Sequence, residues 1–216
     1  IAEQMFYNMK AVELQLSKLE QQVMETANTE QLAEAERARA KLADMATQYD
    51  ALLDELGIVN AKTPPQDRII IEMARSFGEC EVGMPKDLVT EVKRYIEVWR
   101  SNPRLAKALQ RANEQGLAPV ITETLRRHHL PPQFFYVALQ ESDFRHDAVG
   151  PQTRFGIAKG MWQMMPATAN HYGLKIGPLL EKAEYDADDQ RFDAAAATAA
   201  AARYLGDLYR GEAQAS

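Results

Sequence analysis

The first 57 residues constrain the fold most strongly, because they contain no proline and only one glycine, Gly57. Apolar side chains recur there three and four positions apart, which is the spacing of a helix that packs against another helix. They form two series: Met9, Val12, Leu16, Leu19 and Val23, and then Leu42, Met45, Tyr49, Leu52 and Leu56. The series lose their common phase near Asn28, which Gln31 follows at the spacing of a capping box. We therefore expect residues 1–62 to form a long helical hairpin or one continuous coiled coil, with Gly57 as a C-terminal cap.

Shorter helices with clear boundary signals follow the segment Thr63-Pro64-Pro65. We expect a helical connecting region over residues 63–130 and a further helical domain over residues 131–216. The expected helices cover about 67–77, 86–99, 102–116, 118–129, 132–142, 166–172 and 193–209, the last being rich in alanine. Residues 150–160 contain three glycines and are expected to form a loop. No segment of useful length alternates apolar and polar residues, so the sequence predicts an all-α protein.

Charge and cysteine content exclude several classes of function. The net charge is −6 and no basic cluster is present, which argues against nucleic acid as a partner. Cys80 is the only cysteine, so no internal disulfide can form, and we interpret it as a half-buried apolar side chain rather than a reactive thiol. No apolar stretch is long enough to span a membrane, and no signal peptide is visible. The chain begins at Ile1 and not at methionine, which leaves room for an upstream anchoring segment.

Glu141 is the candidate for acid–base chemistry. Helical spacing places Phe134, Val137, Ala138 and Glu141 on one stripe, with Glu141 in the last turn of its helix. Partial desolvation and the negative end of the helix dipole both disfavour an ionised carboxylate there. A carboxyl group that stays protonated near neutral pH is what general-acid cleavage of a glycosidic bond needs. On spacing alone, a glutamate that meets the stripe by chance and points to solvent remains the alternative.

Several sequence elements around Glu141 occur together in a characteristic order. The first is Ala138-Leu139-Gln140-Glu141-Ser142, and the second is Gly160-Met161-Trp162-Gln163-Met164-Met165-Pro166-Ala167-Thr168-Ala169. Tyr172-Gly173-Leu174 follows, and then Asp189-Gln190-Arg191-Phe192-Asp193 with an alanine-rich helix ending Ala202-Arg203-Tyr204-Leu205. Over about residues 131–210 this pattern resembles the catalytic domain of the lytic murein transglycosylases.

The resemblance implies a lysozyme-like α domain of the goose type, with a long cleft for glycan strands. In that family one glutamate, here Glu141, protonates the leaving oxygen with help from the substrate's own acetamido group. The same glutamate then deprotonates the muramyl 6-hydroxyl, which gives a 1,6-anhydro sugar without consuming water. No second catalytic carboxylate, no metal and no cofactor is implied. Asp143 points away from Glu141 on an ideal helix, so we assign it no catalytic role.

The resemblance also suggests which residues bind the substrate. Ser142 matches a serine that supports the glutamate, and Gln163 matches a polar residue that lines the cleft beside it. The other candidates for contact with the sugar are apolar or aromatic, and ordinary core packing is the competing interpretation for each of them. These candidates are Met161, Trp162, Met164, Tyr172 and Tyr204.

Two departures from the family pattern affect these expectations. The segment between Glu141 and Gly160 is longer than usual and contains Arg154 and Lys159, so we expect altered substrate contacts there. The family normally continues to a Tyr-Asn segment whose tyrosine approaches the glutamate, whereas this chain ends at Ser216 without one. We therefore expect the domain to be truncated at its C-terminus.

Two other functions stay open from the sequence. One is a catalytically silent module that binds glycan or serves as a scaffold in an envelope assembly. The other is a hydrolase like the goose-type lysozymes, for which Asp147 is the candidate second acid. In every case the expected partner is peptidoglycan in the periplasm or cell envelope, and the N-terminal helices are expected to bind a protein partner or to self-associate.

Overall fold

The computed structural model describes residues 1–26 and 28–215 of the chain. Two compact units can be distinguished, one over residues 1–96 and one from Glu97 onward. The predicted fold class is confirmed, since long N-terminal helices precede a helical domain and the described residues form only one small sheet. Ala27 and Ser216, which fall within the predicted ranges 1–62 and 131–216, lie outside the described residues.

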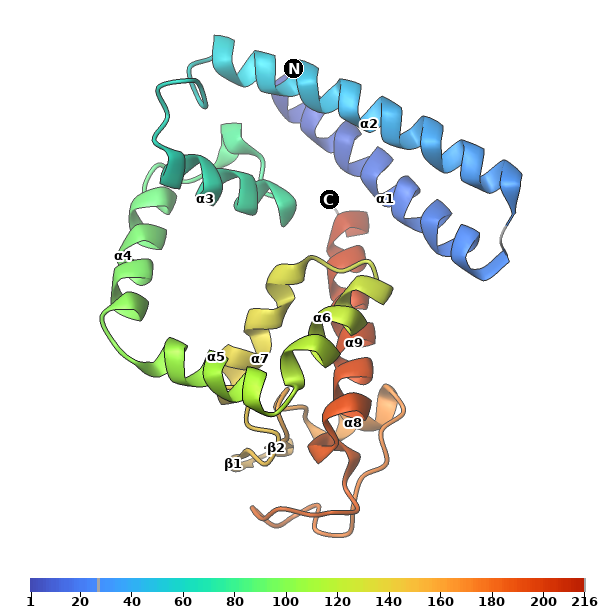
Figure 1. The fold of residues 1–216 in the computed structure, drawn as a ribbon, viewed down its shortest axis with the longest axis vertical. Helices are drawn as coiled ribbons and strands as arrows, with labels where there is room; N and C mark the ends of the chain where they lie inside the picture. The colour runs from blue at the N-terminus through green and yellow to red at the C-terminus, as the bar shows by residue number, and fades with distance from the viewer. Residues whose placement is uncertain (27, 216) are drawn as a thin grey trace. The chain divides into compact units, whose positions relative to one another are not determined.

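The N-terminal region is a helical hairpin. Helices α1 (Ala2–Thr26) and α2 (Thr29–Glu55) lie side by side and pack along their lengths (Figure 1). The Asn28 side chain accepts a hydrogen bond from the Glu30 backbone N–H at 2.8 Å, so Asn28 caps α2 as predicted. Gln31 does not reach back in the way a capping box requires, because its side chain accepts a hydrogen bond from Thr26.

Gly57 ends α2 in the predicted way. Its φ angle is +71°, and its N–H donates to the Asp54 carbonyl at 3.0 Å. The Ile58 N–H donates to the Leu53 carbonyl at 3.0 Å, which completes a Schellman motif. A left-handed residue is needed at this position, and glycine adopts that conformation without a Cβ clash.

The rest of the first unit contains α3 (Pro65–Ser76), the short η1 (Glu81–Gly83) and most of α4 (Leu88–Arg100). A polar network around the buried Glu81 joins α3 and η1 to α2. The Tyr49 hydroxyl donates to Glu81 Oε2 at 2.7 Å, and the Arg75 guanidinium binds Glu81 and lies over the Tyr49 ring. Cys80 contacts the same hydroxyl and is buried, in agreement with its interpretation as a packed side chain.

The second unit is a cluster of helices around one apolar core. In chain order it contains α5 (Arg104–Glu114), α6 (Leu117–Arg127), η2 (Pro132–Phe134), α7 (Phe135–Ser142), β1 (Val149–Thr153), β2 (Gly156–Lys159), α8 (Pro166–His171), η3 (Gln190–Phe192) and α9 (Ala194–Ala215). Helix α9 packs on α6, and its buried alanines let the two backbones approach closely. None of the described helices meets the length and apolarity that a membrane span requires.

The segment expected to be a loop is a β-hairpin. Strands β1 and β2 pair antiparallel, with Thr153 opposite Gly156 and an irregularity between Val149 and Gln152. Side chains of β2 do alternate between inside and outside, but one of its two buried positions is occupied by Lys159. A lysine at an inward position and the Gly150-Pro151 pair in β1 conceal the period-2 pattern from the sequence.

Candidate active site

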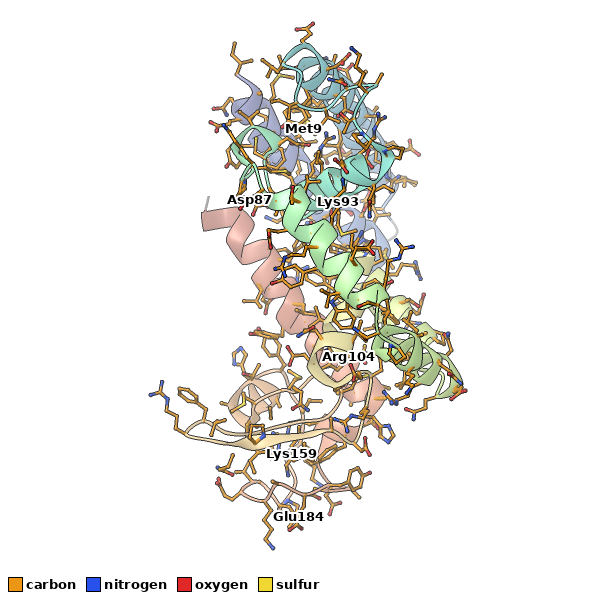
Figure 2. The ribbon with its side chains drawn as sticks, turned by 90° about the vertical axis from the view of Figure 1, so that its left-hand side faces the viewer. Met9, Asp87, Lys93, Arg104, Lys159 and Glu184 are labelled. Carbon is orange, nitrogen blue, oxygen red and sulfur yellow. The ribbon has the colours of Figure 1, made fainter. Side chains whose placement is uncertain are left out.

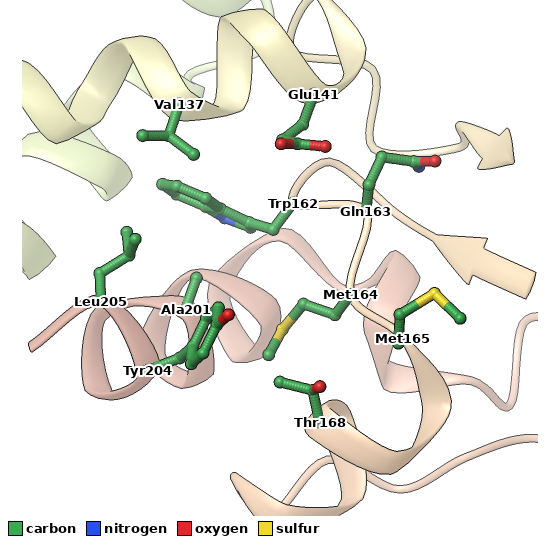
Figure 3. Close-up of a pocket in the computed structure, with 10 residues that line it drawn as sticks. All are labelled: Val137, Glu141, Trp162, Gln163, Met164, Met165, Thr168, Ala201, Tyr204 and Leu205. Atoms are coloured by element: carbon green, nitrogen blue, oxygen red, sulfur yellow. The ribbon is translucent and has the colours of Figure 1, made fainter. Parts of the chain in front are cut away.

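A pocket of about 210 Å³ opens in the second unit beside the end of α7 (Figure 3). Its walls come from α7, the segment after β2, α8 and α9. The lining residues are Val137, Glu141, Trp162, Gln163, Met164, Met165, Thr168, Ala201, Tyr204 and Leu205. Most of this surface is apolar, and among the described residues Glu141 is the only lining side chain with a carboxyl group.

Glu141 projects from the last turn of α7 into this pocket. Its carboxyl group lies over the Trp162 side chain, and Val137 precedes it by one helical turn on the same wall (Figure 3). The predicted stripe is therefore divided, since Val137 and Glu141 face the pocket while Ala138 is fully buried in the core. Glu141 itself is exposed, so the protein alone supplies less desolvation than the sequence suggests.

Ser142 lies behind Glu141 and does not line the pocket. The side chain is buried, and its Oγ donates to the Met161 carbonyl at 2.7 Å. The same Oγ accepts a hydrogen bond from the Arg145 backbone N–H at 3.2 Å. Ser142 thus links the end of α7 to the segment that carries Trp162, which suits a supporting role better than contact with a substrate.

The three neighbouring apolar candidates differ in their surroundings. Met161 is 0% exposed and belongs to the core, so core packing is the correct interpretation for it. Trp162 and Met164 are also mostly buried, but both contribute to the pocket wall. The Trp162 indole N–H donates to Thr198 Oγ1 on α9 at 3.0 Å, which fixes the plane of the ring under Glu141.

Gln163 lines the pocket on the side of the hairpin (Figure 3). Its Nε2 donates to the Gly160 carbonyl at 2.7 Å and to the Ala148 carbonyl at 3.2 Å. Its φ angle is +46°, an uncommon value for a residue other than glycine. Both amide hydrogens are therefore used to hold the base of the hairpin next to Glu141.

The two tyrosine candidates form a pair in which only Tyr204 reaches the pocket. Their ring centroids are 5.5 Å apart, at an angle of 55° between the planes. The Tyr172 hydroxyl donates to Asp207 Oδ2 at 3.0 Å, and burial together with this hydrogen bond raises the pKa of Tyr172. Tyr172 thus supports Tyr204 from behind and does not line the pocket.

One family model matches the part of the chain that contains this pocket. It is described as the transglycosylase SLT domain, and it matches residues 118–214. Residues 118–214 are therefore similar to a transglycosylase SLT domain. No curated protein and no solved structure shows a significant match to the chain. The resemblance to lytic transglycosylases is confirmed for this segment, and at the level of the family it supports cleavage of peptidoglycan.

The pocket lies wholly within the matched SLT domain, and its lining includes residues that the sequence analysis did not select. Met165 and Thr168 lie in the element from Gly160 to Ala169 but were not among the predicted substrate-binding residues. Ala201 stands three positions from Tyr204 and four from Leu205, so helical spacing along α9 could have identified both.

Two basic residues of the long segment do not alter the pocket of the SLT domain as expected. Lys159 is 0% exposed, and its Nζ donates to the Leu179 carbonyl at 2.8 Å. Burial lowers the pKa of Lys159, and the nearby Arg191 acts in the same direction. Arg154 is exposed at the tip of the hairpin, where its guanidinium lies over the Phe155 ring. Neither residue is part of the pocket lining, and the expectation was wrong for Lys159.

The two other acidic residues considered from the sequence, Asp143 and Asp147, do not line the pocket. Asp147 is exposed and does not line it, and Asp143 is bound to Arg104. Among the described residues, no group of histidine, cysteine and acidic side chains is placed to hold a metal ion. Glu141 thus supplies the one carboxyl group among the described lining residues, beside the polar side chains of Gln163, Thr168 and Tyr204.

Proposed function

We propose that this chain is a peptidoglycan lytic transglycosylase that cleaves the bond between MurNAc and GlcNAc and leaves 1,6-anhydro-MurNAc ends. Glu141 is the single general acid and base of the reaction. The observation that carries the proposal is the position of its carboxyl group, which is the one carboxyl among the described lining residues of the SLT-domain pocket.

The reaction needs one proton to leave Glu141 and one to return. The protonated carboxyl donates to the glycosidic oxygen as the bond to C1 of the muramyl residue breaks. The acetamido group of the same sugar assists this departure. The resulting carboxylate then removes the proton of the muramyl 6-hydroxyl, whose oxygen forms the new bond to C1. Atoms balance without water, so a second carboxylate for activating water is not required.

Because Glu141 is exposed in the free protein, the bound substrate must remove part of the water around its carboxyl group. A sugar ring lying on Val137, Trp162 and Tyr204 would displace water from the carboxyl group. Removing water disfavours the charged form of a carboxyl group, which favours the acid needed for the first step.

The supporting residues act by holding the shape of the pocket. Ser142 fixes the end of α7 against the Met161 carbonyl, and Gln163 fixes the hairpin base. Trp162, Met164 and Tyr204 provide apolar faces against which sugar rings pack.

Mass spectrometry of purified peptidoglycan after incubation with the protein tests the proposal. Native protein should release anhydro-muropeptides, and Glu141→Gln should release none while keeping the native circular dichroism spectrum. Glu181→Gln, an exposed change outside the pocket, is the matched control and should behave as native. Products with reducing ends would indicate a hydrolase instead. Glycan binding without any release would indicate the catalytically silent module.

We also propose that the protein acts in the periplasm or cell envelope, where its substrate lies, and that the α1–α2 hairpin binds a protein partner or a second copy. The support is the substrate class of the SLT domain and a hairpin whose polar faces are exposed. Fractionation of cells expressing the tagged protein tests the location. Sedimentation of the protein with and without residues 1–62 tests self-association.

A further inference from the structure

The turn directly after Glu141 and Ser142 has an unusual backbone. Asp143 has a φ angle of +53° and Phe144 one of +60°, so two successive residues other than glycine are left-handed. Side chains with a Cβ disfavour this conformation, and it persists only where neighbouring contacts hold it. Here it reverses the chain at the end of α7, one residue beyond Ser142.

This turn maintains the last helical turn of α7. The Asp143 N–H donates to the Leu139 carbonyl at 2.9 Å, and the Phe144 N–H donates to the Ala138 carbonyl at 3.3 Å. Both hydrogen bonds enclose the turn that carries Glu141. If Asp143 relaxed to an ordinary conformation, the Phe144 bond to the Ala138 carbonyl would break, and a helix of only eight residues would lose the contact that closes its last turn.

Two arginines of α5 hold Asp143 in place. Arg104 Nε donates to Asp143 Oδ1 at 2.7 Å, and Arg111 Nη1 donates to the Asp143 carbonyl at 2.6 Å. The two arginines are seven positions apart, so they lie on the same face of α5. The Trp99 ring lies 4.9 Å from the Arg104 guanidinium and restricts its position further. Figure 2 labels Arg104 at the start of this helix.

Phe144 is held by different means. Its side chain is 0% exposed and its ring centroid is 4.7 Å from that of Phe135. Core packing therefore secures the second left-handed residue, whereas the first depends on the α5 arginines. The two supports can be perturbed separately.

We propose that Arg104 and Arg111 are positioning residues of the transglycosylase reaction, and that α5 belongs to the catalytic unit. Helix α5 ends at Glu114, outside the residues 118–214 that match the SLT domain, so the family match does not include it. The arginines act through Asp143 by keeping the last turn of α7 formed, and thereby keep the Glu141 carboxyl over Trp162. The inference rests on the proposed role of Glu141.

We call Arg104 and Arg111, which both bind Asp143, the clamp. Hydrogen–deuterium exchange tests whether the clamp holds the turn, independently of activity. In Arg104→Ala and Arg111→Ala, the amides of residues 141–144 should exchange about tenfold faster, because a charge-assisted hydrogen bond that holds the turn is lost. Arg126→Ala is the matched control, since Arg126 is exposed on α6 and its guanidinium pairs with Glu123 on the same helix. Exchange at native rates in both clamp variants would overturn the proposal.

Kinetics on purified peptidoglycan test the catalytic meaning of the clamp. Arg104→Ala should lower kcat about tenfold with KM nearly unchanged, because a small displacement of an acid–base group slows chemistry more than binding. Arg104→Lys should restore part of kcat. Faster exchange with native kcat would overturn the positioning role, and a rise in KM alone would assign Arg104 to substrate binding instead.

Asp143→Gly provides an internal check, since glycine adopts the left-handed conformation without help from Arg104. Adding Arg104→Ala to Asp143→Gly should then lower kcat less than adding it to the native chain, and equal losses in both backgrounds would overturn the mechanism. A native protein that releases no products would overturn the proposed function and the catalytic role of the clamp together. The exchange experiment would still decide whether the arginines hold the turn.

Discussion

The buried ion pair between Asp189 and Arg191 allows one prediction to be worked out fully. Both side chains are 0% exposed, and the Arg191 guanidinium donates to both carboxylate oxygens of Asp189, at 3.0 Å from Nε and 2.7 Å from Nη2. Its Nη1 also donates to the Ile157 carbonyl at 2.7 Å and to the Met164 carbonyl at 3.2 Å. The Arg191 side chain therefore links η3 to β2 and to the segment that carries Trp162.

Arg191→Met removes these hydrogen bonds while keeping an unbranched side chain. It leaves the Asp189 carboxylate buried without its partner and two backbone carbonyls without this donor. Breaking a buried pair on one side reduces stability by about 3–5 kcal/mol, because the remaining charge keeps its desolvation penalty. A domain of this size is stable by roughly 5–15 kcal/mol, so the variant should lose a large share of its stability.

Urea unfolding monitored by tryptophan fluorescence measures this loss, because Trp99 and Trp162 both belong to the second unit. The double variant Asp189→Leu/Arg191→Met should recover much of the stability, since no unpaired charge remains buried. Arg126→Met, in an exposed pair, is the control and should unfold at nearly the native urea concentration. A loss below about 1 kcal/mol for Arg191→Met, or a double variant as unstable as the sum of the single variants, would refute the reasoning.

Three further predictions concern the same domain. Burial would raise the pKa of Asp189, but its bonds to Arg191 outweigh this effect and lower the pKa below the ordinary 3.8. The stability that the ion pair contributes should therefore be intact above about pH 4 and lost as the pH falls through the lowered pKa. An acid-unfolding curve unchanged by Asp189→Asn would contradict this prediction. Gly160→Ala should reduce stability by more than about 2 kcal/mol, because its φ is +79° and the new Cβ would overlap the Arg191 carbonyl. Gly116→Ala, at φ +66° in open space, should reduce stability by only about 1 kcal/mol. Equal losses in urea unfolding would show that the overlap at Gly160 relaxes freely. Tyr204→Ala should lower kcat/KM on purified peptidoglycan about tenfold by removing one apolar wall of the pocket, and a native value would exclude Tyr204 from the substrate site.

The helices and their caps could be predicted from the sequence, because each depends on residues only a few positions apart in the chain. The helices, the cap at Asn28 and the Schellman motif at Gly57 use hydrogen bonds that span two to five positions, so the residues that decide them are adjacent in the chain. The placement of Glu141 on the wall of a pocket followed from helical spacing and from the resemblance to a family.

The roles of the residues around Glu141 depended on contacts that the sequence does not display. Met161 and Trp162 are adjacent, yet one is in the core and the other forms the pocket wall beneath Glu141. Ser142 turned out to bind a carbonyl nineteen positions away. The dependence of the Asp143 turn on α5 was not visible either, because Arg104 and Arg111 precede it by more than thirty residues.

The sequence by itself determined the helical class and the approximate positions of the helices, because both depend on residues that are close together in the chain. Tertiary structure decided which face of each segment is buried, as Lys159 illustrates most clearly. A lysine in a strand predicts a solvent-facing position, but a carbonyl from residue 179 accepts its charge-assisted hydrogen bond, and the Phe192 ring lies 5.7 Å from its Nζ. Burial of a charge becomes favourable only when such distant partners are assembled around it, and that assembly is a property of the folded chain.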